Sequence, residues 1–332
     1  MNATNFTKRL DDIDILKGWA ILLVVMGHSV PGDMISNMPS VLAWAYKWIY
    51  SFHMPLFMMA SGFLFAYKGA KNTYGKFVSN KFKRLLLPYF IITLLVFIPK
   101  VILSHYALRP LQFSLSSLIE SILYPRDNPI LFFWFLPTLF IIFLAGPLWK
   151  RLGQLSFWTQ AAFTFLLAVC YISQPFLNVR FLNLCGVIHY LIFFWIGCLL
   201  ANNYQKLTDW LEKKTSFFIL LALTVALNFI PGSDFTIRFI AAVIGILMSV
   251  SLAKQALKFN QQWLSFFGRY SYQIYLLSWF PQSLSVLLLY RILHWPFFIA
   301  SLAMLISGIF IPILCAIGTN RYFSRFNIVI GQ

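Results

Sequence analysis

Long apolar runs separated by short polar segments dominate the chain. Each run approaches the roughly 20 residues that an α-helix needs to cross the hydrocarbon core of a bilayer. The pattern predicts an all-α integral membrane protein with about ten transmembrane helices, forming one domain over residues 1–332 with no attached soluble domain. The predicted spans are 13–31, 47–66, 85–104, 130–149, 157–174, 187–202, 216–231, 236–253, 272–290 and 296–318.

Composition and charge placement agree with this fold class. The 332 residues are 60% hydrophobic and only 11% charged, whereas soluble domains have about 25% charged residues. The 26 Lys and Arg residues exceed the 9 Asp and Glu residues, which suggests either nucleic acid or cytoplasmic loops facing anionic lipid. With the N-terminus inside, 19 of the 26 cations fall on the cytoplasmic side, as the positive-inside rule requires. Both termini are therefore expected in the cytoplasm, with the lipid bilayer and not nucleic acid as the partner.

A polar seam runs through the first span, DILKGWAILLVVMGH, from Asp14 to His28. Helical periodicity places Lys17 and His28 within about 20° of each other around the helix and roughly 16 Å apart along its axis, with Asp14 on the same face. Ionisable groups are costly in contact with lipid, so this face is expected to point into the protein and mark a site. The alternative is that Lys17 extends to the membrane surface and His28 is a buried, hydrogen-bonded histidine.

A second histidine lies near the start of the second span, which begins SFHMPLFMMASGFLF. His53 and His28 are both near predicted outer helix ends, so they are expected at similar depth. An imidazole titrates near neutral pH and can take a proton from a hydroxyl, which makes the pair a candidate catalytic site. Metal binding is an alternative without a persuasive third ligand. Alternatively, His53 hydrogen-bonds backbone freed by Pro55.

Cations also gather where the third span begins, in KFVSNKFKRLLLPYF. Lys81 and Arg84 are three residues apart, so both can address one anion, such as a phosphate, from one helix face. Positive-inside placement alone also explains them. If the functional interpretation holds, a phosphate-bearing donor rests on cytoplasmic cations while an outer-half histidine activates an acceptor. The roughly 16 Å between Lys17 and His28 suits a coenzyme A thioester, whose phosphates and acyl group lie at opposite ends.

These residues resemble a known family, the membrane-bound acyltransferase 3 family. Asp14-Ile15-Leu16-Lys17-Gly18-Trp19-Ala20 followed by His28 is similar to its opening motif, D-x-L-R-G-x-A with a histidine eleven residues after the basic position. The resemblance covers nearly the whole chain and is closest to the fucose 4-O-acetylase-like branch. It continues in Phe52–Phe57, Ser61-Gly62-Phe63, Lys81–Tyr89, Trp134-Phe135-Leu136, Gly268–Ser271 and Ile274–Leu277.

The resemblance implies a multi-pass O-acyltransferase of the bacterial inner or plasma membrane. The co-substrate would be a cytoplasmic acyl-CoA, commonly acetyl-CoA, with no metal, and the acceptor a hydroxyl of a surface glycan or its lipid-linked precursor. His28 would be the essential histidine; from the residues themselves, His28 is expected to act as general base with His53 as helper. Lys17 would be its basic partner, and Lys81 and Arg84 the cytoplasmic pair. The oligomeric state is not indicated.

Three residues depart from the family pattern. Lys17 and Lys81 replace more usual arginines, which removes the planar bidentate fork, and Ser278 stands where many relatives have histidine. Direct acyl transfer is expected, since no Ser or Cys lies at a recognisable spacing from His28. The rival class is a transporter or flippase of glycans or small anions, which also places ionisable groups in broken helices near the membrane midplane. A transporter predicts internal repeat symmetry, which the sequence does not show.

Overall fold

The structure is a computed structural model that describes residues 11–69, 73–106, 109–173, 179–203, 209–230, 234–259 and 262–322. The regular elements within these residues are helices, as the apolar runs predict. They are α1 (Asp11–Gly27), η2 (Gly32–Asn37), α2 (Ser40–Lys68), α3 (Tyr74–Lys81), the π-helical η3 (Phe82–Leu86), α4 (Leu87–Ile102), η4 (Ser104–Tyr106), α5 (Leu115–Leu123), η5 (Pro125–Asp127), α6 (Phe135–Leu144), α7 (Gly146–Leu152), α8 (Phe157–Ser173), η7 (Phe181–Asn183), α9 (Leu184–Asn202), α11 (Lys214–Phe229), α12 (Phe235–Lys258), α13 (Gln262–Arg269), α14 (Ser271–Leu277), α15 (Trp279–Ser285), the π-helical η8 (Val286–Ile292) and α16 (Phe297–Tyr322).

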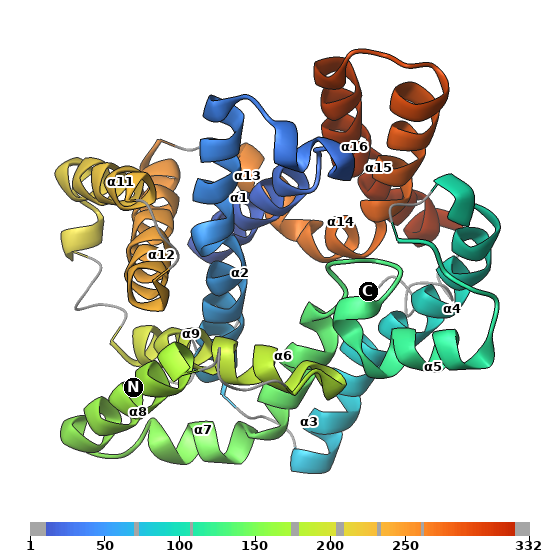
Figure 1. The fold of residues 1–332 in the computed structure, drawn as a ribbon. Helices are drawn as coiled ribbons and strands as arrows, with labels where there is room; N and C mark the ends of the chain where they lie inside the picture. Colours follow the sequence, from blue (N-terminus) through green and yellow to red (C-terminus); the bar gives the residue numbers. More distant parts are fainter. Residues whose placement is uncertain are drawn as a thin grey trace.

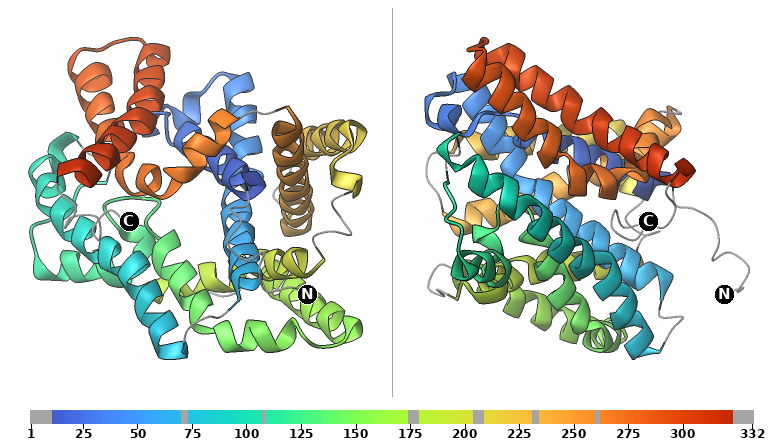
Figure 2. Two further views of the ribbon diagram at one scale, coloured as in Figure 1. Left: turned by 180° about the vertical axis from the view of Figure 1, so that it is seen from behind. Right: turned by 90° about the vertical axis from the view of Figure 1, so that its right-hand side faces the viewer.

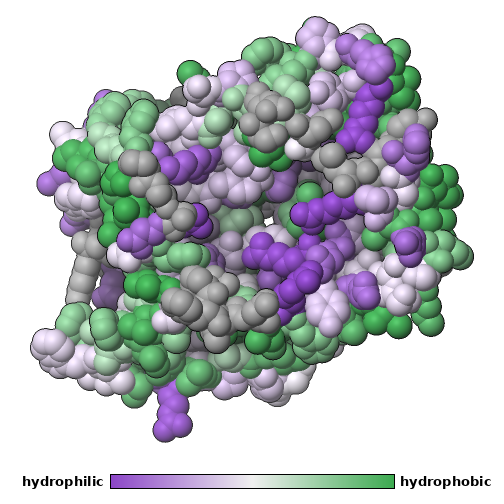
Figure 3. All heavy atoms as spheres, viewed as in Figure 1, coloured by the Kyte–Doolittle hydropathy of each residue, from purple (hydrophilic) through white to green (hydrophobic). Residues whose placement is uncertain are grey.

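Within the described residues, five helical stretches are long and apolar enough to cross a membrane, or six if the bent pair α6 and α7 forms one span. Apolar side chains such as Leu95, Phe165 and Leu314 are exposed on α4, α8 and α16, which is the arrangement expected where helices meet lipid. Figure 3 shows hydrophilic residues gathered towards the middle of one face and hydrophobic residues along its right-hand margin. The chain is thus a multi-pass membrane protein, while ten spans and cytoplasmic termini stay predictions.

Two predicted spans are interrupted in the structure. Residues 130–149 contain a non-helical start, then α6 and α7, which meet at an angle of 60°. Gly146-Pro147 follows the break, and proline disfavours a continuous helix through the residues before it. Residues 272–290 divide into α14, α15 and part of η8, where polar residues, including the buried Ser278 and Gln282, interrupt the apolar run.

The N-terminal helices α1 and α2 form the centre of the fold. Figure 1 shows α11 and α12 on one side of them and α4 and α5 on the other, and the rear view in Figure 2 shows the same order reversed. Helix α2 packs along α9, and α1 packs against α13 and α12. Twelve of the 17 residues of α1 are buried, so its polar seam lies within protein and not against lipid.

Close helix crossings depend on glycine at two positions. A Cβ added to Gly18 in α1 would lie 1.9 Å from the carbonyl oxygen of Leu264 in α13. A Cβ on Gly62 in α2 would lie 1.9 Å from the carbonyl oxygen of Phe194 in α9. Small residues allow such close backbone approach between membrane helices. The Ser61-Gly62 pair therefore includes a packing position.

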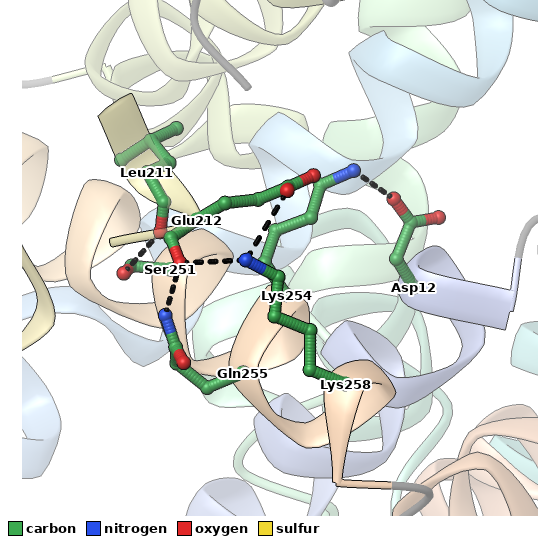
Figure 4. Close-up of polar contacts among 7 residues, drawn as sticks. All are labelled: Asp12, Leu211, Glu212, Ser251, Lys254, Gln255 and Lys258. Carbon is green, nitrogen blue, oxygen red and sulfur yellow. Dashed lines mark hydrogen bonds and ion pairs between the residues drawn. The ribbon is translucent and has the colours of Figure 1, made fainter. Parts of the chain in front are cut away.

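A buried ion pair joins the start of α1 to α12. Lys254 Nζ lies 2.9 Å from Asp12 Oδ2, and both side chains are 9% exposed. Figure 4 shows this pair beside a set of side chains that fix residues 211–212 to α12. That set consists of Ser251 donating to the Leu211 carbonyl, Gln255 and Lys258 donating to the Glu212 carbonyl, and Lys258 pairing with the Glu212 carboxylate. These contacts hold the polar end of α1 against α12.

Candidate functional site

A cavity of about 360 Å³ lies between α1, α2, α3, η3, α6 and α14, and we call it the basic cavity. It brings together the three cations that the sequence singled out on two segments, Lys17 on one and Lys81 with Arg84 on the other. Four basic side chains line it, and the other lining residues are polar or apolar. The lining residues are Lys17, Met54, Phe57, Ser61, Leu64, Phe65, Lys68, Gly69, Phe77, Asn80, Lys81, Arg84, Leu85, Phe135, Leu139, Phe143, Ser271, Tyr272 and Tyr275.

Lys17 reaches this cavity from the polar seam of α1. Its Nζ lies 2.8 Å from Asp14 Oδ1, one helical turn earlier, and its side chain is 27% exposed. The carboxylate therefore restrains the ammonium group at the cavity wall. This inward position agrees with the first interpretation of the seam and not with a lysine extended to the membrane surface.

Lys81 and Arg84 enter the cavity from the junction of α3 and η3. Lys81 Nζ lies 3.6 Å from the centre of the Phe143 ring, and Arg84 Cζ lies 5.4 Å from the centre of the Tyr272 ring. The Tyr272 hydroxyl donates to the Arg84 carbonyl and ties η3 to α14. Because η3 is a π-helical segment, the three-residue spacing does not follow α-helical periodicity, yet both side chains line the cavity.

Three of the four cations of the basic cavity, Lys68, Lys81 and Arg84, lack matching carboxylates among the described residues. Lys81 interacts electrostatically with both Arg84 and Lys68. Among the described residues, these three form no ion pair, and the lining contains no Asp or Glu. Like charges held together repel unless an anion lies between them. The cavity is therefore suited to an anionic ligand.

Sequence reasoning missed Lys68 as a site residue. It occupies the last turn of α2, which ends at Gly69 with a φ of 61°. The Lys-Gly pair at the end of an apolar run was the available signal, since it marks a helix end. Tyr272 and Asn80 were also missed, because aromatic and amide residues at helix ends are too common to single out.

The remainder of the cavity lining is largely apolar, and its two serine hydroxyls are already engaged. Met54, Phe57 and Phe135 contribute to this wall. Ser61 Oγ donates to the Phe57 carbonyl at 2.9 Å, and Ser271 Oγ donates to the Gly268 carbonyl at 2.8 Å. The cavity thus offers a basic part and an uncharged part to one ligand.

His28 lies just beyond the opposite end of α1 from the basic cavity. Its backbone N–H closes the helix by donating to Val24 and Val25. Its half-buried ring packs on two aromatic rings, with centres 5.0 Å from Phe132 and 6.1 Å from Tyr50. The Tyr50 hydroxyl donates to the Gly27 carbonyl at 3.1 Å. Aromatic packing and this hydrogen bond therefore fix the turn that carries His28.

His53 shares an aromatic neighbour with His28. Its ring centre lies 4.8 Å from that of Tyr50, so both imidazoles pack on one tyrosine, while their similar depth in the membrane stays a prediction. Nδ1 of His53 lies 2.8 Å from the Ile49 carbonyl oxygen. A carbonyl can only accept, so Nδ1 carries the proton and Nε2 is left as an acceptor. Within the described residues, no group of three potential metal ligands is present.

The histidine pair and the basic cavity are neighbouring but separate features. Neither His28 nor His53 is among the lining residues, whereas Met54, which follows His53, is. Phe132 packs on His28 and also on Tyr275 of the cavity wall, with ring centres 5.4 Å apart. The Tyr275 hydroxyl donates to the Phe132 carbonyl at 2.6 Å. Met54, Phe132 and Tyr275 therefore link the two features.

Nodulation proteins are among the known proteins that resemble this chain in sequence. The chain is similar to the nodulation protein NolL of Sinorhizobium fredii, with 26% identity over 215 residues, or 64% of this chain and 54% of the relative. It is also similar to the nodulation protein NolL of Mesorhizobium japonicum, with 26% identity over 221 residues, or 65% and 55% of the two chains. The match thus spans about half the length of these curated relatives, and no solved structure matches. The narrower fucose 4-O-acetylase-like branch stays a prediction. A family defined as an acyltransferase domain matches residues 10–317, so the chain belongs to this acyltransferase family.

Proposed function

We propose that the protein is a membrane O-acyltransferase that moves an acyl group, usually acetyl, from cytoplasmic acyl-CoA to a hydroxyl of a surface glycan or its lipid-linked precursor. The bacterial cell membrane is the proposed location. One observation supports this most strongly: Lys17 and the pair Lys81 and Arg84, from two segments, line one cavity whose remaining lining is largely apolar. A coenzyme A thioester carries phosphates at one end and an uncharged arm at the other, and it matches both parts.

The basic side chains are proposed to bind the donor. Lys17, Lys81 and Arg84 interact with the phosphates through charge-assisted hydrogen bonds, and Lys68 adds a fourth cation to the same wall. The thioester arm extends along Met54, Phe57 and Phe135 towards the histidines. Because lysine lacks the bidentate fork of arginine, Arg84 supplies the planar contact in this set.

His28 is proposed to act as the general base. It accepts the proton of the acceptor hydroxyl while that oxygen attacks the thioester carbonyl carbon, and the C–S bond then breaks as coenzyme A leaves and gains a proton. His53, whose Nε2 is the free acceptor, assists from the other side of Tyr50. Direct transfer is favoured over an acyl-enzyme because Ser61 and Ser271 in the cavity both donate to backbone carbonyls.

The test is release of free thiol by the purified protein supplied with acetyl-CoA and candidate glycans. Acceptor-dependent thiol release, together with acetylated product, is expected. Mass spectrometry of surface polysaccharides from cells with and without the protein then identifies the acceptor. Transport of a glycan without thiol release would instead favour the transporter class, and a covalent acyl-protein trapped by labelled donor would contradict direct transfer.

A further inference from the structure

A second group of basic side chains lies on the His28 side of the fold. Helix α6 begins after Trp134, and Phe135, Leu139 and Phe143 along it line the basic cavity. Phe132, two residues before Trp134, packs on His28. Arg126, His189 and Arg238 surround this region, and we call these three residues the outer basic cluster. None of them lines the basic cavity.

Arg126 is held in place by several contacts, although it is exposed. Its Cζ lies 4.3 Å from the centre of the Trp134 ring, and its Nε donates to Asn183 Oδ1 at 3.1 Å. Asn183 in turn donates to Thr138 Oγ1 at 2.7 Å. Asn183 has a φ of 56°, and the preceding Leu182 has a φ of 48°. Left-handed backbone at residues other than glycine is strained and is common at binding sites.

The aromatic rings of this region are already covered. Trp134 stacks on Tyr190 with ring centres 5.1 Å apart and an interplanar angle of 21°, while Arg126 covers it as well. His189 packs on Tyr171 at 4.3 Å and on Tyr190 at 4.7 Å. These rings therefore support the charged groups and do not offer a free face for stacking a sugar. These residues would therefore recognise a ligand through its charge.

Among the described residues, no carboxylate forms an ion pair with the outer basic cluster. Arg238 covers the Phe235 ring, whose centre lies 6.2 Å from that of Tyr171, and Tyr171 packs on His189. Both arginines interact electrostatically with His189, whose nitrogens have no hydrogen-bond partner among the described residues. The two nearest acidic residues in sequence to the arginines are otherwise engaged. Asp127 pairs with Arg180, and Asp234 accepts from the Thr236 backbone N–H at the start of α12. Cations gathered without a counter-charge favour an anion between them.

We propose that the outer basic cluster binds an anionic group, a phosphate or carboxylate, of the glycan acceptor. This inference rests on the proposed function, because it assigns the acceptor a side and a charge. Arg126 and Arg238 hold the anion by charge-assisted hydrogen bonds, and His189 contributes an N–H between them. A phosphate could belong to a sugar phosphate or to a membrane lipid, and the two sources are separable by experiment.

The test uses the full chain in phosphatidylcholine nanodiscs without acyl donor. Binding of glucose 1-phosphate is measured by isothermal titration calorimetry, with glucose as the neutral match. We expect glucose 1-phosphate to bind, glucose not to bind, and Arg238→Gln and Arg126→Gln each to weaken binding about tenfold or more. Arg238→Gln carries the test if Arg126→Gln fails to fold, since Arg238 is exposed and stacks only on its own helix at Phe235. Arg109→Gln, which removes an exposed arginine outside the cluster, is the control and should bind like the parent.

Equal binding by all variants, or no binding of glucose 1-phosphate, overturns the proposal. If the arginine variants instead lose phosphatidylglycerol that the parent retains in native mass spectrometry, and no sugar phosphate binds, the cluster is a lipid headgroup site and the acceptor assignment is wrong. Since no donor is present, this outcome is independent of acyl transfer. If the chain binds glucose 1-phosphate through Arg238 but never releases thiol, the result supports the anion site and contradicts the proposed acyltransferase function.

Discussion

Gln282 of α15 donates its side-chain amide to the Val25 carbonyl at 3.2 Å, at the last turn of α1. The same amide donates to Ser29 Oγ at 3.1 Å, and Ser29 Oγ donates to the Val25 carbonyl at 2.6 Å. Gln282 is buried, at 3% exposure. Residues 25 and 29 flank His28, so this network joins α15 to the turn that carries the proposed base. Gln282 is therefore a positioning residue.

Replacing Gln282 should lower turnover without weakening donor binding. Gln282→Glu keeps the size of the side chain but removes the N–H donor, so the His28 turn loses its link to α15. We expect kcat to fall roughly tenfold to a hundredfold, since small misplacements of catalytic groups have effects of this size, while KM for acetyl-CoA stays unchanged. Steady-state kinetics of thiol release measure both values. An unchanged kcat would show that Gln282 does not position His28.

The cations of the basic cavity should govern donor binding. Lys81→Ala and Arg84→Ala each remove a charge-assisted contact to donor phosphate, which is worth about 1.5–3 kcal/mol. KM for acetyl-CoA should rise about tenfold or more, with a smaller effect on kcat. Lys83→Ala is the matched control, because Lys83 is exposed, lies between the other two and does not line the cavity. If all three variants behave alike, the cavity is not the donor site.

The buried pair of Asp12 and Lys254 predicts a stability effect with a distinct pattern. Asp12→Ala leaves the buried Lys254 ammonium without this carboxylate, which typically costs about 3–5 kcal/mol. Lys254→Met combined with Asp12→Leu removes both charges and should recover most of that loss. Thermal unfolding in detergent, followed by circular dichroism, compares the single and double variants. If the double variant is destabilised as much as Asp12→Ala, the loss of stability comes from packing and not from the unpaired charge.

The close approach of α1 and α13 predicts that Gly18 tolerates no side chain. A Cβ there would lie 1.9 Å from the Leu264 carbonyl oxygen, which is backbone and cannot rotate away. Gly18→Ala should therefore lower the melting temperature and reduce the yield of folded protein. Gly75→Ala is the matched control, since nothing lies within 4 Å of the added Cβ, and it should behave like the parent. A stable Gly18→Ala protein would argue against this packing.

Much of the fold and part of the site followed from the sequence. Apolar runs located the helices, and the seam of Lys17 and His28 was placed inside the protein by the cost of exposing charge to lipid. Lys17, Lys81 and Arg84 converge as the donor hypothesis needs. Their shared cavity could be anticipated because all three lie at helix ends predicted to face the cytoplasm.

Features that depend on pairing between distant segments were not predictable. The hydrogen bond from Gln282 to Val25 joins residues 257 positions apart, and no periodicity in the sequence predicts it. The division of residues 272–290 into short helices was missed because its overall composition is apolar, although Ser278 and Gln282 are buried there. Lys68 reaches the cavity because of the direction in which α2 points at its end. That direction is set by the packing of the helices and not by the local sequence.

We propose that the polar seam of α1 connects donor binding near Lys17 to proton transfer at His28. Its most direct test is acceptor-dependent thiol release from acetyl-CoA by purified His28→Gln protein, with donor affinity measured separately by titration calorimetry. We predict that acetyl-CoA binds as it does to the parent, while thiol release falls by about 100-fold or more, which is the usual contribution of a general base. Full thiol release by His28→Gln, with acetylated product, would contradict the account.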